Sequence, residues 1–335
     1  MSQPFISIII PCRNEEKHIA QCLDSLLEND YVKENSEIFI VDGMSRDSTM
    51  SIVDSYMTRF SFIKVLQNPA KIFPSAANIG INASNGEFIF IIGAHAQYDK
   101  EYISKCVAHS IRLNADNIGG ILKTESQNEG FLGDLVISAL SSRFGVGNST
   151  FRTGSEKVME VDTVFGGCYK REVFDKIGLF NENLVSTSDY ELNKRLRRNG
   201  GKIFLVPDIK ATYFTRTSFK EFITNNFRNG FWAIYPVVFV NYIPVSLRHL
   251  VPLFFLLTLS GLFFLSFFSQ LFGYILLGIL VLYFSVAVYF SIKTLKIKTA
   301  LFLPFIFFLL HLSYGLGSFI ALLRILLLKS FKLFQ

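Results

Sequence analysis

The hydrophobic pattern of the first 100 residues alternates between short apolar runs and segments with helical spacing. Short apolar runs are typical of buried strands, and apolar positions three and four apart predict amphipathic helices. Strands are expected at Phe5–Ile10, Ile38–Val41, Ile63–Leu66 and Phe88–Ile92, and helices at Glu16–Leu27, Ser48–Tyr56 and Pro74–Ala83. This β-α-β alternation predicts an α/β fold with a mainly parallel sheet and helices on both faces.

The C-terminal part has a different pattern, because Leu250–Ile292 contains no charged residue. That length suffices for two membrane passes of about 20 residues each, with a break at Ser269–Gly273. A third pass fits Thr299–Leu323, whose only titratable residue is His311. For this histidine we favour a polar contact between helices over a catalytic role. The tail therefore predicts an all-α transmembrane region of about three helices.

The charges divide the chain at Glu221, after which there is no Asp or Glu. Eight of the 33 basic residues follow that point, so the first part carries 25 basic and all 27 acidic residues. The basic pI is thus a property of the apolar tail, which favours anionic lipid as the partner and argues against nucleic acid.

Basic residues between the predicted spans indicate the membrane orientation. Lys293, Lys296 and Lys298 lie between the second and third spans, and the positive-inside rule assigns that loop to the cytoplasm. We therefore expect a multi-pass protein of the cell membrane with its N-terminal domain in the cytoplasm. Three spans leave later basic residues outside, so a re-entrant last segment is the alternative; these residues are Arg324, Lys329 and Lys332.

The candidate binding edge follows from the predicted sheet, because open sheets of this kind bind ligands beyond the carboxyl ends of their strands. The rule selects Pro11–Glu15, Asp42–Gly43 and Gly93–His95, which follow the first, second and fourth strands. The sequence lacks the G-x-G-x-x-G dinucleotide pattern and the G-x-x-x-x-G-K phosphate loop at these positions. A nucleotide bound here would be held by a carboxylate instead of a glycine-rich loop.

A second candidate site is the acidic tract Ser186–Leu192, which precedes the basic run Lys194–Arg198 at the start of a predicted helix. A carboxylate at a helix N-terminus is a plausible general base, oriented by backbone N–H groups. Asp189 and Glu191 are two residues apart and cannot share one helical face. Helix capping is the alternative explanation for this tract.

Several motifs together resemble those of family 2 glycosyltransferases, which have a GT-A fold, and the nearest subgroup is the succinoglycan-type exopolysaccharide enzymes. The opening strand and loop are Ser7–Glu16, and the second-strand signature is Ile40–Thr49. The middle and later motifs are Asn68–Lys71, Asn78–Ile81, Ala94–Tyr98, Phe165–Phe174 and Pro207–Ile209. The resemblance covers about residues 5–235 and implies a Rossmann-like, mixed but mainly parallel sheet.

The resemblance also implies a nucleotide site. Asp42 would receive the base, and the residues around the first strand's loop would surround base and ribose. Lys71 would lie close to the nucleotide, with a solvated loop lysine as the alternative. The residues assigned to nucleotide-sugar binding are Pro11, Arg13, Glu15, Asp42, Lys71 and Gly93.

The family's metal site follows the fourth strand as an Asp-x-Asp or Asp-x-His pattern, but here Gly93 occupies the first position. His95 is then the sole obvious protein ligand of a divalent cation, Mn²⁺ or Mg²⁺, with diphosphate and water completing the shell. Imidazole suits Mn²⁺ better than Mg²⁺. A structural histidine on a loop is the alternative.

Asp189 matches the catalytic aspartate of the family, although Ser188 replaces the usual Glu before it. The acceptor side would include Asp162, Gly166, Gly167 and Glu191; a plain strand-end turn also explains Asp162 and the two glycines. Arg228 and Trp232 occupy the place of an Arg/Trp element near the diphosphate. An aromatic belt at the membrane entry is their alternative explanation.

The resemblance implies inverting transfer of a sugar from a nucleotide diphosphate, expected to be a UDP-sugar, to a polyprenyl-linked acceptor in exopolysaccharide or cell-surface glycan synthesis. The expected domains are a glycosyltransferase domain at 1–217, an interfacial amphipathic segment at 218–247 and transmembrane helices at 248–335. A polyprenyl-phosphate glycosyltransferase and a degenerate, non-catalytic transferase subunit are the alternatives.

Overall fold

The computed structural model describes residues 3–31, 35–126, 130–215, 218–294 and 297–333. Contacts between residues divide the chain into two compact units. The sheet unit comprises 1–125 and 150–214, and the helix unit comprises 126–149 and 215–335. Residues 126–149 thus belong with the C-terminal helices, although they lie within the range 1–217 expected for the glycosyltransferase domain.

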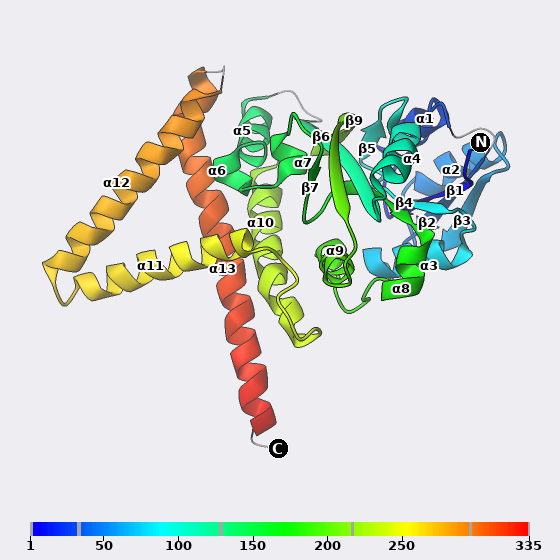
Figure 1. Cartoon of the computed structure of the whole chain (residues 1–335). Helices are drawn as coiled ribbons and strands as arrows, with labels where there is room; N and C mark the ends of the chain where they lie inside the picture. Colours follow the sequence, from blue (N-terminus) through cyan, green and yellow to red (C-terminus); the bar gives the residue numbers. More distant parts are fainter. Residues whose placement is uncertain (1–2, 32–34, 127–129, 216–217, 295–296, 334–335) are drawn as a thin grey trace. The chain divides into compact units, whose positions relative to one another are not determined.

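The sheet unit begins with four strands and three helices that alternate along the chain (Figure 1). The strands are β1 (Ile6–Cys12), β2 (Ser36–Asp42), β3 (Ile63–Gln67) and β4 (Phe88–Ile91). The helices between them are α1 (Ile19–Leu27), α2 (Thr49–Met57) and α3 (Phe73–Ala83). Each predicted element is present within a few residues of its expected bounds.

The remaining elements of the sheet unit extend the sheet with antiparallel strands. The strands are β5 (Ala96–Tyr98), β6 (Asn117–Ser126), β7 (Met159–Glu160), β8 (Phe165–Lys170) and β9 (Ile203–Thr215). The helices are α4 (Tyr102–Leu113), α7 (Thr150–Thr153), α8 (Arg171–Ile177) and α9 (Ser188–Arg198). The strand order is β3-β2-β1-β4-β8-β6-β9-β5, with β7 paired to β9.

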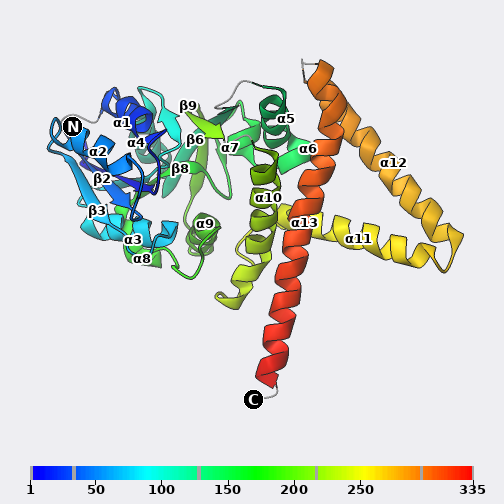
Figure 2. The ribbon, with the colours of Figure 1, turned by 180° about the vertical axis from the view of Figure 1, so that it is seen from behind.

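Right-handed connections decide which face each helix covers. The chain moves from β1 to β2 to β3 in one direction and then reverses from β3 to β4, which pairs with the other side of β1. Accordingly α1 and α4 cover one face of the sheet, and α3, α8 and α9 cover the other (Figures 1 and 2). The reversal beside β1 is the switch point at which sheets of this kind bind ligands.

The first strand continues through Pro11 to Cys12, two residues beyond its predicted end. Proline has no N–H to donate and is disfavoured inside a sheet. The pairing of β1 with β4 reaches only Ile9, whereas the pairing of β1 with β2 continues to Cys12 and Asp42. Pro11 therefore lies where β1 has neighbours on one side, and its missing donor is tolerated.

The first helix begins at Ile19 and not at Glu16. The N–H of Glu15 donates to Thr49 Oγ1 at 2.7 Å, and that of Glu16 donates to Asp47 Oδ2 at 3.2 Å. These bonds hold the loop after β1 against the loop after β2. The helix therefore starts only after the turn in which the His18 N–H donates to the Glu15 carbonyl.

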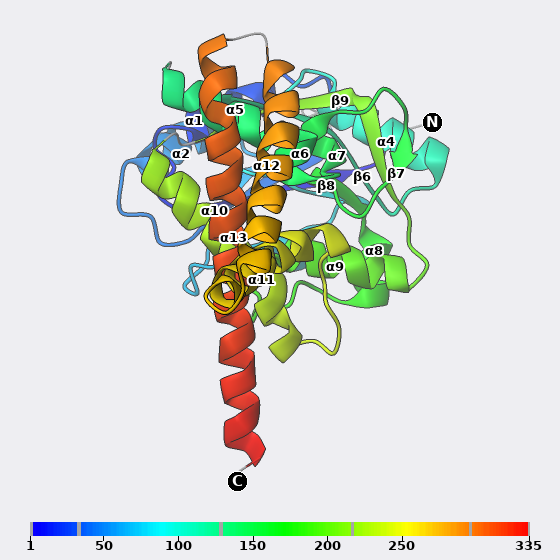
Figure 3. The same cartoon turned by 90° about the vertical axis from the view of Figure 1, so that its left-hand side faces the viewer.

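Among its described residues, the helix unit contains three helices long and apolar enough to cross a membrane. They are α11 (Val251–Ser266), α12 (Gln270–Ile292) and α13 (Ile297–Leu333), with apolar spans at Leu247–Ser266, Gln270–Ile292 and Ile297–Leu328. The break predicted at Ser269–Gly273 falls at the start of α12. Within this unit α12 runs beside α13 (Figure 3). Lys296, one of the three lysines expected in the cytoplasm, lies outside the described residues.

Residues 126–149 contribute α5 (Phe131–Leu140) and α6 (Arg143–Val146) to the helix unit. Leu135, Val136 and Ala139 of α5 share a buried apolar cluster with Leu303 and Phe307 of α13. An apolar segment between two strands of the sheet unit is therefore packed into the core of the C-terminal helices.

His311 makes the polar contact between helices that its sequence position favours. Its Nε2 lies 3.1 Å from the carbonyl oxygen of Phe144 in α6, and its Nδ1 lies 2.7 Å from the hydroxyl of Tyr283 in α12. Because a carbonyl only accepts, Nε2 carries the hydrogen and Nδ1 of the neutral ring accepts from Tyr283. This histidine joins α6, α12 and α13.

The segment expected at the membrane interface forms α10 (Phe219–Ile234), followed by short 3₁₀ turns at Tyr235–Val238 and Leu247–Leu250. Ser218 caps α10 by accepting the N–H of Glu221, and its hydroxyl donates to the Glu221 carboxylate. The helix packs along α13 (Figures 1 and 2). Its location in the headgroup layer stays a prediction.

Glycines allow α10 and α13 to approach closely. A Cβ at Gly230 would overlap the carbonyl oxygen of Tyr314, and one at Gly317 would overlap that of Phe227. The hydroxyl of Ser318 donates to the Gly230 carbonyl at 2.9 Å. Small residues with a hydroxyl hydrogen bond are typical of tightly packed membrane helices.

We predict that Gly230→Ala destabilises the protein by about 1–3 kcal/mol, the usual cost of overpacking. Gly261→Ala is the matched control, because a Cβ there meets no atom of the described chain within 4 Å. Thermal unfolding of the two variants in detergent measures the difference. Equal midpoints for the two variants would refute the close contact between α10 and α13.

Candidate active site

The candidate site lies where β1, β2 and β4 end. In the parallel register Cys12 pairs with Asp42, and Ile9 pairs with both Phe39 and Ile91. The loops that follow these strands therefore begin side by side. This arrangement brings together the three segments that the sequence selected: 11–15, 42–43 and 93–95.

Side chains join the loops after β1 and β2. The N–H of Asn14 donates to Ser45 Oγ at 2.9 Å, and the N–H of Arg46 donates to Asn14 Oδ1 at 2.9 Å. Asn14 has a left-handed φ of 56°, a conformation that Asn adopts more readily than most residues. The two loops thus hold each other in one conformation.

Asp42 is oriented by Ser45, three residues later. Its buried carboxylate accepts the Ser45 hydroxyl at 2.6 Å and the Ser45 N–H at 3.1 Å from each oxygen. Gly43 follows directly, and a Cβ there would lie 3.1 Å from the Cβ of Arg13. The two loops approach so closely at Gly43 that a larger side chain there would crowd Arg13.

Lys71 lies on the loop after β3, at the same edge of the sheet. The N–H of Asn68 donates to the Asp42 carbonyl at 2.7 Å, and the N–H of Lys71 donates to the Asn68 carbonyl at 3.1 Å. Lys71 is exposed and has a left-handed φ of 61°. The backbone of this loop is therefore tied to Asp42, while the function of the lysine side chain stays a prediction.

The segment after β4 is fixed by a buried tyrosine. The Tyr98 hydroxyl accepts the N–H of Gly93 at 3.0 Å and lies 3.1 Å from its carbonyl, to which it donates. The pair of bonds holds the Gly93 peptide at the start of the turn. A Cβ at Gly93 would meet only Phe165 Cζ, at 3.9 Å, among the described residues.

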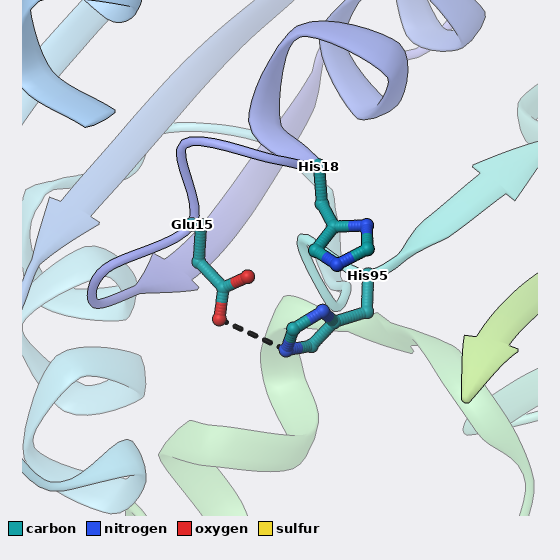
Figure 4. Close-up of side chains that lie close together, drawn as sticks. All are labelled: Glu15, His18 and His95. Carbon is teal, nitrogen blue, oxygen red and sulfur yellow. Dashed lines mark ion pairs between the residues drawn. The ribbon is translucent and has the colours of Figure 1, made fainter. Parts of the chain in front are cut away.

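His95 contacts two residues of the loop after β1 (Figure 4). Its Nε2 lies 2.9 Å from Glu15 Oε1, and its ring lies edge-on to that of His18 with 4.6 Å between centroids. One ligand atom from each of Glu15, His18 and His95 lies within 4.8 Å of the others. Carboxylate and imidazole groups fit a divalent cation. The sequence predicted His95 as the sole protein ligand, and the structure places two further candidate ligands, Glu15 and His18, beside it.

Helix α9 carries Asp189 in its first turn. Lys202, which follows the end of α9, bonds to Asp116, which directly precedes β6. The N–H of Lys202 donates to the Asp116 carboxylate, and the carbonyl of Lys202 accepts the N–H of Asp116. The helix has 11 residues and is about 16 Å long. The opposite edge of the sheet contains the ends of β1, β2 and β4, because β6 runs antiparallel to β8 and β8 antiparallel to β4. That Asp189 reaches this opposite edge stays a prediction.

A buried polar network holds α9 on the sheet. Asn193, one turn after Asp189, donates to Thr163 Oγ1 at 2.9 Å and accepts from Tyr169 at 3.1 Å and Asn117 at 2.9 Å. Asn193 and Asn117 are fully buried. Residues one turn apart share a helical face, so Asp189 also faces the sheet.

Burial changes the acidity of Asp189. Part of the residue is exposed, but its carboxyl group is surrounded by protein, and the loss of water raises its pKa above the ordinary value. Hydrogen bonds from the N–H groups of Tyr190 and Asp189 itself lower the pKa by a smaller amount. A raised pKa makes the carboxylate a stronger base.

Glu191 faces away from Asp189 and is buried in an ion pair. Its two carboxylate oxygens lie 2.9 Å from Nε and Nη2 of Arg195. Arg195 also donates to the carbonyls of Ile177, Gly178 and Leu179. These contacts join α9 to the end of α8; a role of Glu191 on the acceptor side stays a prediction.

The other residues expected on the acceptor side precede or begin β8. Asp162 is half-buried just before the strand, and Gly166 has a left-handed φ of 59°. A Cβ at Gly166 would lie 2.6 Å from the Tyr102 hydroxyl, and one at Gly167 would lie 2.6 Å from Asn117 Oδ1. Both glycines are therefore required by packing, which the strand-end explanation also expects.

Arg228 and Trp232 lie on α10 and belong to the helix unit. Arg228 is exposed and donates to Asn225 Oδ1 at 3.2 Å, while Trp232 packs edge-on against Phe231 and Tyr235. Their assignment to the diphosphate stays a prediction.

Sequence reasoning missed His18, Ser45 and Asn193. His18 could have been found, because Glu15 and His18 are three residues apart at a helix start and share one face. The contacts of Ser45 and Asn193 depend on which loops and strands become neighbours, and no local pattern signals them.

The chain matches the sequence model described as "Glycosyl transferase family 2" over residues 7–178, slightly more than half of its length. It therefore belongs to this family and is a glycosyltransferase, as its motifs predict.

One relative matches almost the whole chain. It is the dolichyl N-acetyl-alpha-D-glucosaminyl phosphate 3-beta-D-2,3-diacetamido-2,3-dideoxy-beta-D-glucuronosyltransferase of Methanococcus voltae, 29% identical over 331 residues, with 96% of this chain and 98% of the relative covered. Succinoglycan biosynthesis protein ExoA of Rhizobium meliloti is 25% identical over 211 residues, covering 62% of this chain and 63% of the relative.

The solved structures confirm the fold. The mannosyltransferase PcManGT from Pyrobaculum calidifontis, in complex with GDP-Man and Mn²⁺, superposes with a TM-score of 0.67 over 96% of this chain and 88% of that one, at 15% identity. The predicted GT-A class, with its mainly parallel sheet followed by apolar helices, is confirmed.

We predict that Glu191→Gln destabilises the fold by about 3–5 kcal/mol, because it leaves Arg195 without its buried counter-ion. Glu172→Gln is the matched control: Glu172 lies 3.7 Å from Lys170, its side chain is 71% exposed, and exposed pairs contribute only about 0–1 kcal/mol. Thermal unfolding checks both variants. Equal losses of stability would contradict the structural role of Glu191.

Proposed function

We propose that this protein is a membrane-bound inverting glycosyltransferase that moves a sugar from a nucleotide diphosphate to a lipid-linked acceptor. The observation that supports the proposal most is the position of Asp189. This carboxyl group, whose pKa is raised by burial, faces the sheet, and we expect it at the edge that also holds the oriented carboxylate of Asp42. Acceptor activation and donor binding can then occur at one edge.

The donor would bind over the ends of β1 and β2. Asp42 would accept hydrogen bonds from the nucleotide base, with Pro11, Arg13 and Glu15 around base and ribose, and with the Gly93 turn and Lys71 nearby. UDP-sugars are the proposed donor class. The structures named for UDP with GalNAc and for GDP-Man, both with Mn²⁺, bind nucleotides on the same fold.

Asp189 would take the proton from the acceptor hydroxyl. As the hydroxyl oxygen bonds to the anomeric carbon, the bond from that carbon to the diphosphate breaks on the opposite face, and the diphosphate leaves with the electron pair. A divalent cation beside His95 would stabilise the negative charge that develops on the leaving diphosphate. Asp162, Gly166, Gly167 and Glu191 would border the acceptor.

A lipid-linked acceptor is supported by the apolar helices and by the relative named as acting on a dolichyl-linked sugar phosphate. We place the protein in the cell membrane as a multi-pass protein with the sheet unit in the cytoplasm, where the positive-inside rule assigns Lys293 and Lys298. Arg228 and Trp232 would lie near the diphosphate. The product would serve exopolysaccharide or cell-surface glycan synthesis.

Product analysis distinguishes the two enzymatic possibilities. An extended lipid-linked saccharide supports the proposal. A sugar attached directly to a polyprenyl monophosphate would instead identify a polyprenyl-phosphate glycosyltransferase. The absence of any transfer with a full panel of nucleotide sugars and lipid acceptors would favour a non-catalytic subunit, for which Gly93 is the sequence argument.

We predict that Asp189→Asn lowers the transfer rate by about 10²–10⁴-fold, the usual contribution of a general base. Binding of the nucleotide sugar should change little, since Asp189 acts on the acceptor. The control is Asp175→Asn, on the exposed surface of α8. Initial rates with detergent-solubilised protein measure the effect, and wild-type turnover by Asp189→Asn would exclude Asp189 as the base.

The raised pKa of Asp189 also predicts two effects of pH. The rate should fall on acidification at a higher pH than an ordinary Asp would give, because only the carboxylate can take a proton. The folded protein binds this proton more tightly than the unfolded chain, so its stability falls as pH rises from the ordinary pKa to the raised one. Asp189→Asn should remove this slope and raise the melting temperature at neutral pH; a lower melting temperature would contradict the burial cost.

A further inference from the structure

The side chains of the buried residues Glu15 and His18 and the partly exposed His95 form a polar cluster that the catalytic proposal does not fully use (Figure 4). Glu15 and His18 come from the loop before α1, and His95 comes from the turn after β4. The N–H of His18 donates to the Glu15 carbonyl at 2.9 Å, which closes the turn that aims both side chains toward His95. Local structure and strand order therefore create the cluster together.

Two atoms of this cluster are buried without a hydrogen-bond partner among the described residues: Glu15 Oε2 and His95 Nδ1. The Glu15 side chain is 10% exposed. Buried carboxylate oxygens without a partner carry a large desolvation cost and are rare in folded proteins. The Glu15 side chain is also oriented toward the two imidazoles, so its second oxygen is available to a ligand at this position.

We propose that Glu15, His18 and His95 together bind one divalent cation, with Glu15 supplying the carboxylate that Gly93 lacks. The inference deepens the proposed function and rests on it for the role of the cation in transfer. The three residues offer one carboxylate and two imidazole nitrogens, a ligand set that can hold a divalent cation without the diphosphate.

The distances require only small movements. Glu15 Oε1 and His95 Nε2 are already 2.9 Å apart, and the three ligand atoms lie within 4.8 Å of one another. Bonds of about 2.0–2.2 Å to a metal bring ligand atoms to roughly 3.0–3.5 Å. Movements of the His18 and His95 side chains by about 1–2 Å therefore close the set, and the metal replaces the hydrogen between Glu15 and His95.

The ligand types predict which cation binds. Mg²⁺ prefers an octahedral shell of oxygen atoms, whereas imidazole nitrogen suits Mn²⁺ and the later transition metals. Two nitrogens and one carboxylate therefore select Mn²⁺ over Mg²⁺. A site that depends on diphosphate for most of its ligands would bind neither ion without nucleotide.

The test is a titration of the full, metal-free chain in detergent with MnCl₂ alone, followed by the loss of the free-ion electron paramagnetic resonance signal. Wild type should bind one Mn²⁺ per chain, and Mg²⁺ should compete only weakly. Glu15→Gln and His18→Ala should each weaken binding by at least about 10-fold, the lower range for loss of a group that supports a metal. Unchanged affinity in both variants would overturn the proposal.

Matched controls separate the cluster from general charge effects. Glu28→Gln changes an exposed glutamate at the end of α1, and His109→Ala changes a histidine of α4 that contacts Asp208 and Arg112. Both should bind Mn²⁺ as wild type does. A loss of affinity in either control equal to that in Glu15→Gln would also overturn the assignment.

Pulsed resonance of bound Mn²⁺ gives a readout that does not depend on variant stability. Wild type should show coupling to two histidine nitrogens, and His18→Ala should show coupling to one. Absence of nitrogen coupling in wild type would overturn the proposal even if every variant failed to fold.

A rescue experiment tests the compensation directly. Gly93→Asp places a carboxylate on the neighbouring turn, where a Cβ has an ordinary contact of 3.9 Å with Phe165. In the Glu15→Gln background it should restore at least part of the lost Mn²⁺ affinity. No recovery in a folded double variant would contradict the exchange of carboxylates between positions 15 and 93.

Metal binding and sugar transfer fail in distinguishable ways. Wild-type transfer combined with unaltered Mn²⁺ binding by Glu15→Gln would reject the cluster and leave the proposed function intact. Mn²⁺ binding with two nitrogens but no transfer to any acceptor would reject the function and leave the metal site intact.

Discussion

The pairing of β1 between β2 and β4 is the constraint on which the candidate site depends. Because β1 is parallel to both neighbours, three strand ends and their loops meet at one edge of the sheet. The side chains of Asn14, Ser45 and Thr49 accept hydrogen bonds from backbone N–H groups, and these bonds fix the loops against one another. The carboxylate of Asp42 and the Glu15–His95 pair are oriented by these contacts and would otherwise be mobile loop residues.

Buried polar groups determine the position of α9 and therefore of Asp189. Asn193 satisfies three hydrogen bonds to the sheet, and Arg195 neutralises Glu191 while binding carbonyls at the end of α8. Breaking such a network costs more than the net stability it adds, because each partner would be left buried and unpaired. The network thus specifies one position of the helix, and the incomplete solvation of Asp189 at its start raises the pKa of that carboxyl group.

The helix unit is stabilised by different interactions from those of the sheet unit. Apolar surface gives helices in a membrane little reason to associate, so close packing and polar contacts between them matter more. Gly230 and Gly317 allow α10 and α13 to approach, and His311 bonds both Tyr283 and the Phe144 carbonyl. Residues 126–149, an apolar segment between two strands of the sheet, belong to this unit and pack with the helices that we expect to contact lipid.

The sequence by itself determined the period of each element, since apolar runs and helical spacing are local properties: the first four strands, three helices and three apolar spans all lie near their predicted positions. It also proposed Asp42, His95 and Asp189 as site residues, because they follow strands or open a helix within motifs that resemble those of the family. Only the tertiary structure decided that Glu15 and His18 lie beside His95, that Glu191 is paired with Arg195, and that 126–149 packs with the C-terminal helices. Each of these depends on contacts between residues distant in sequence, which the strand order and helix packing create and which no local pattern encodes.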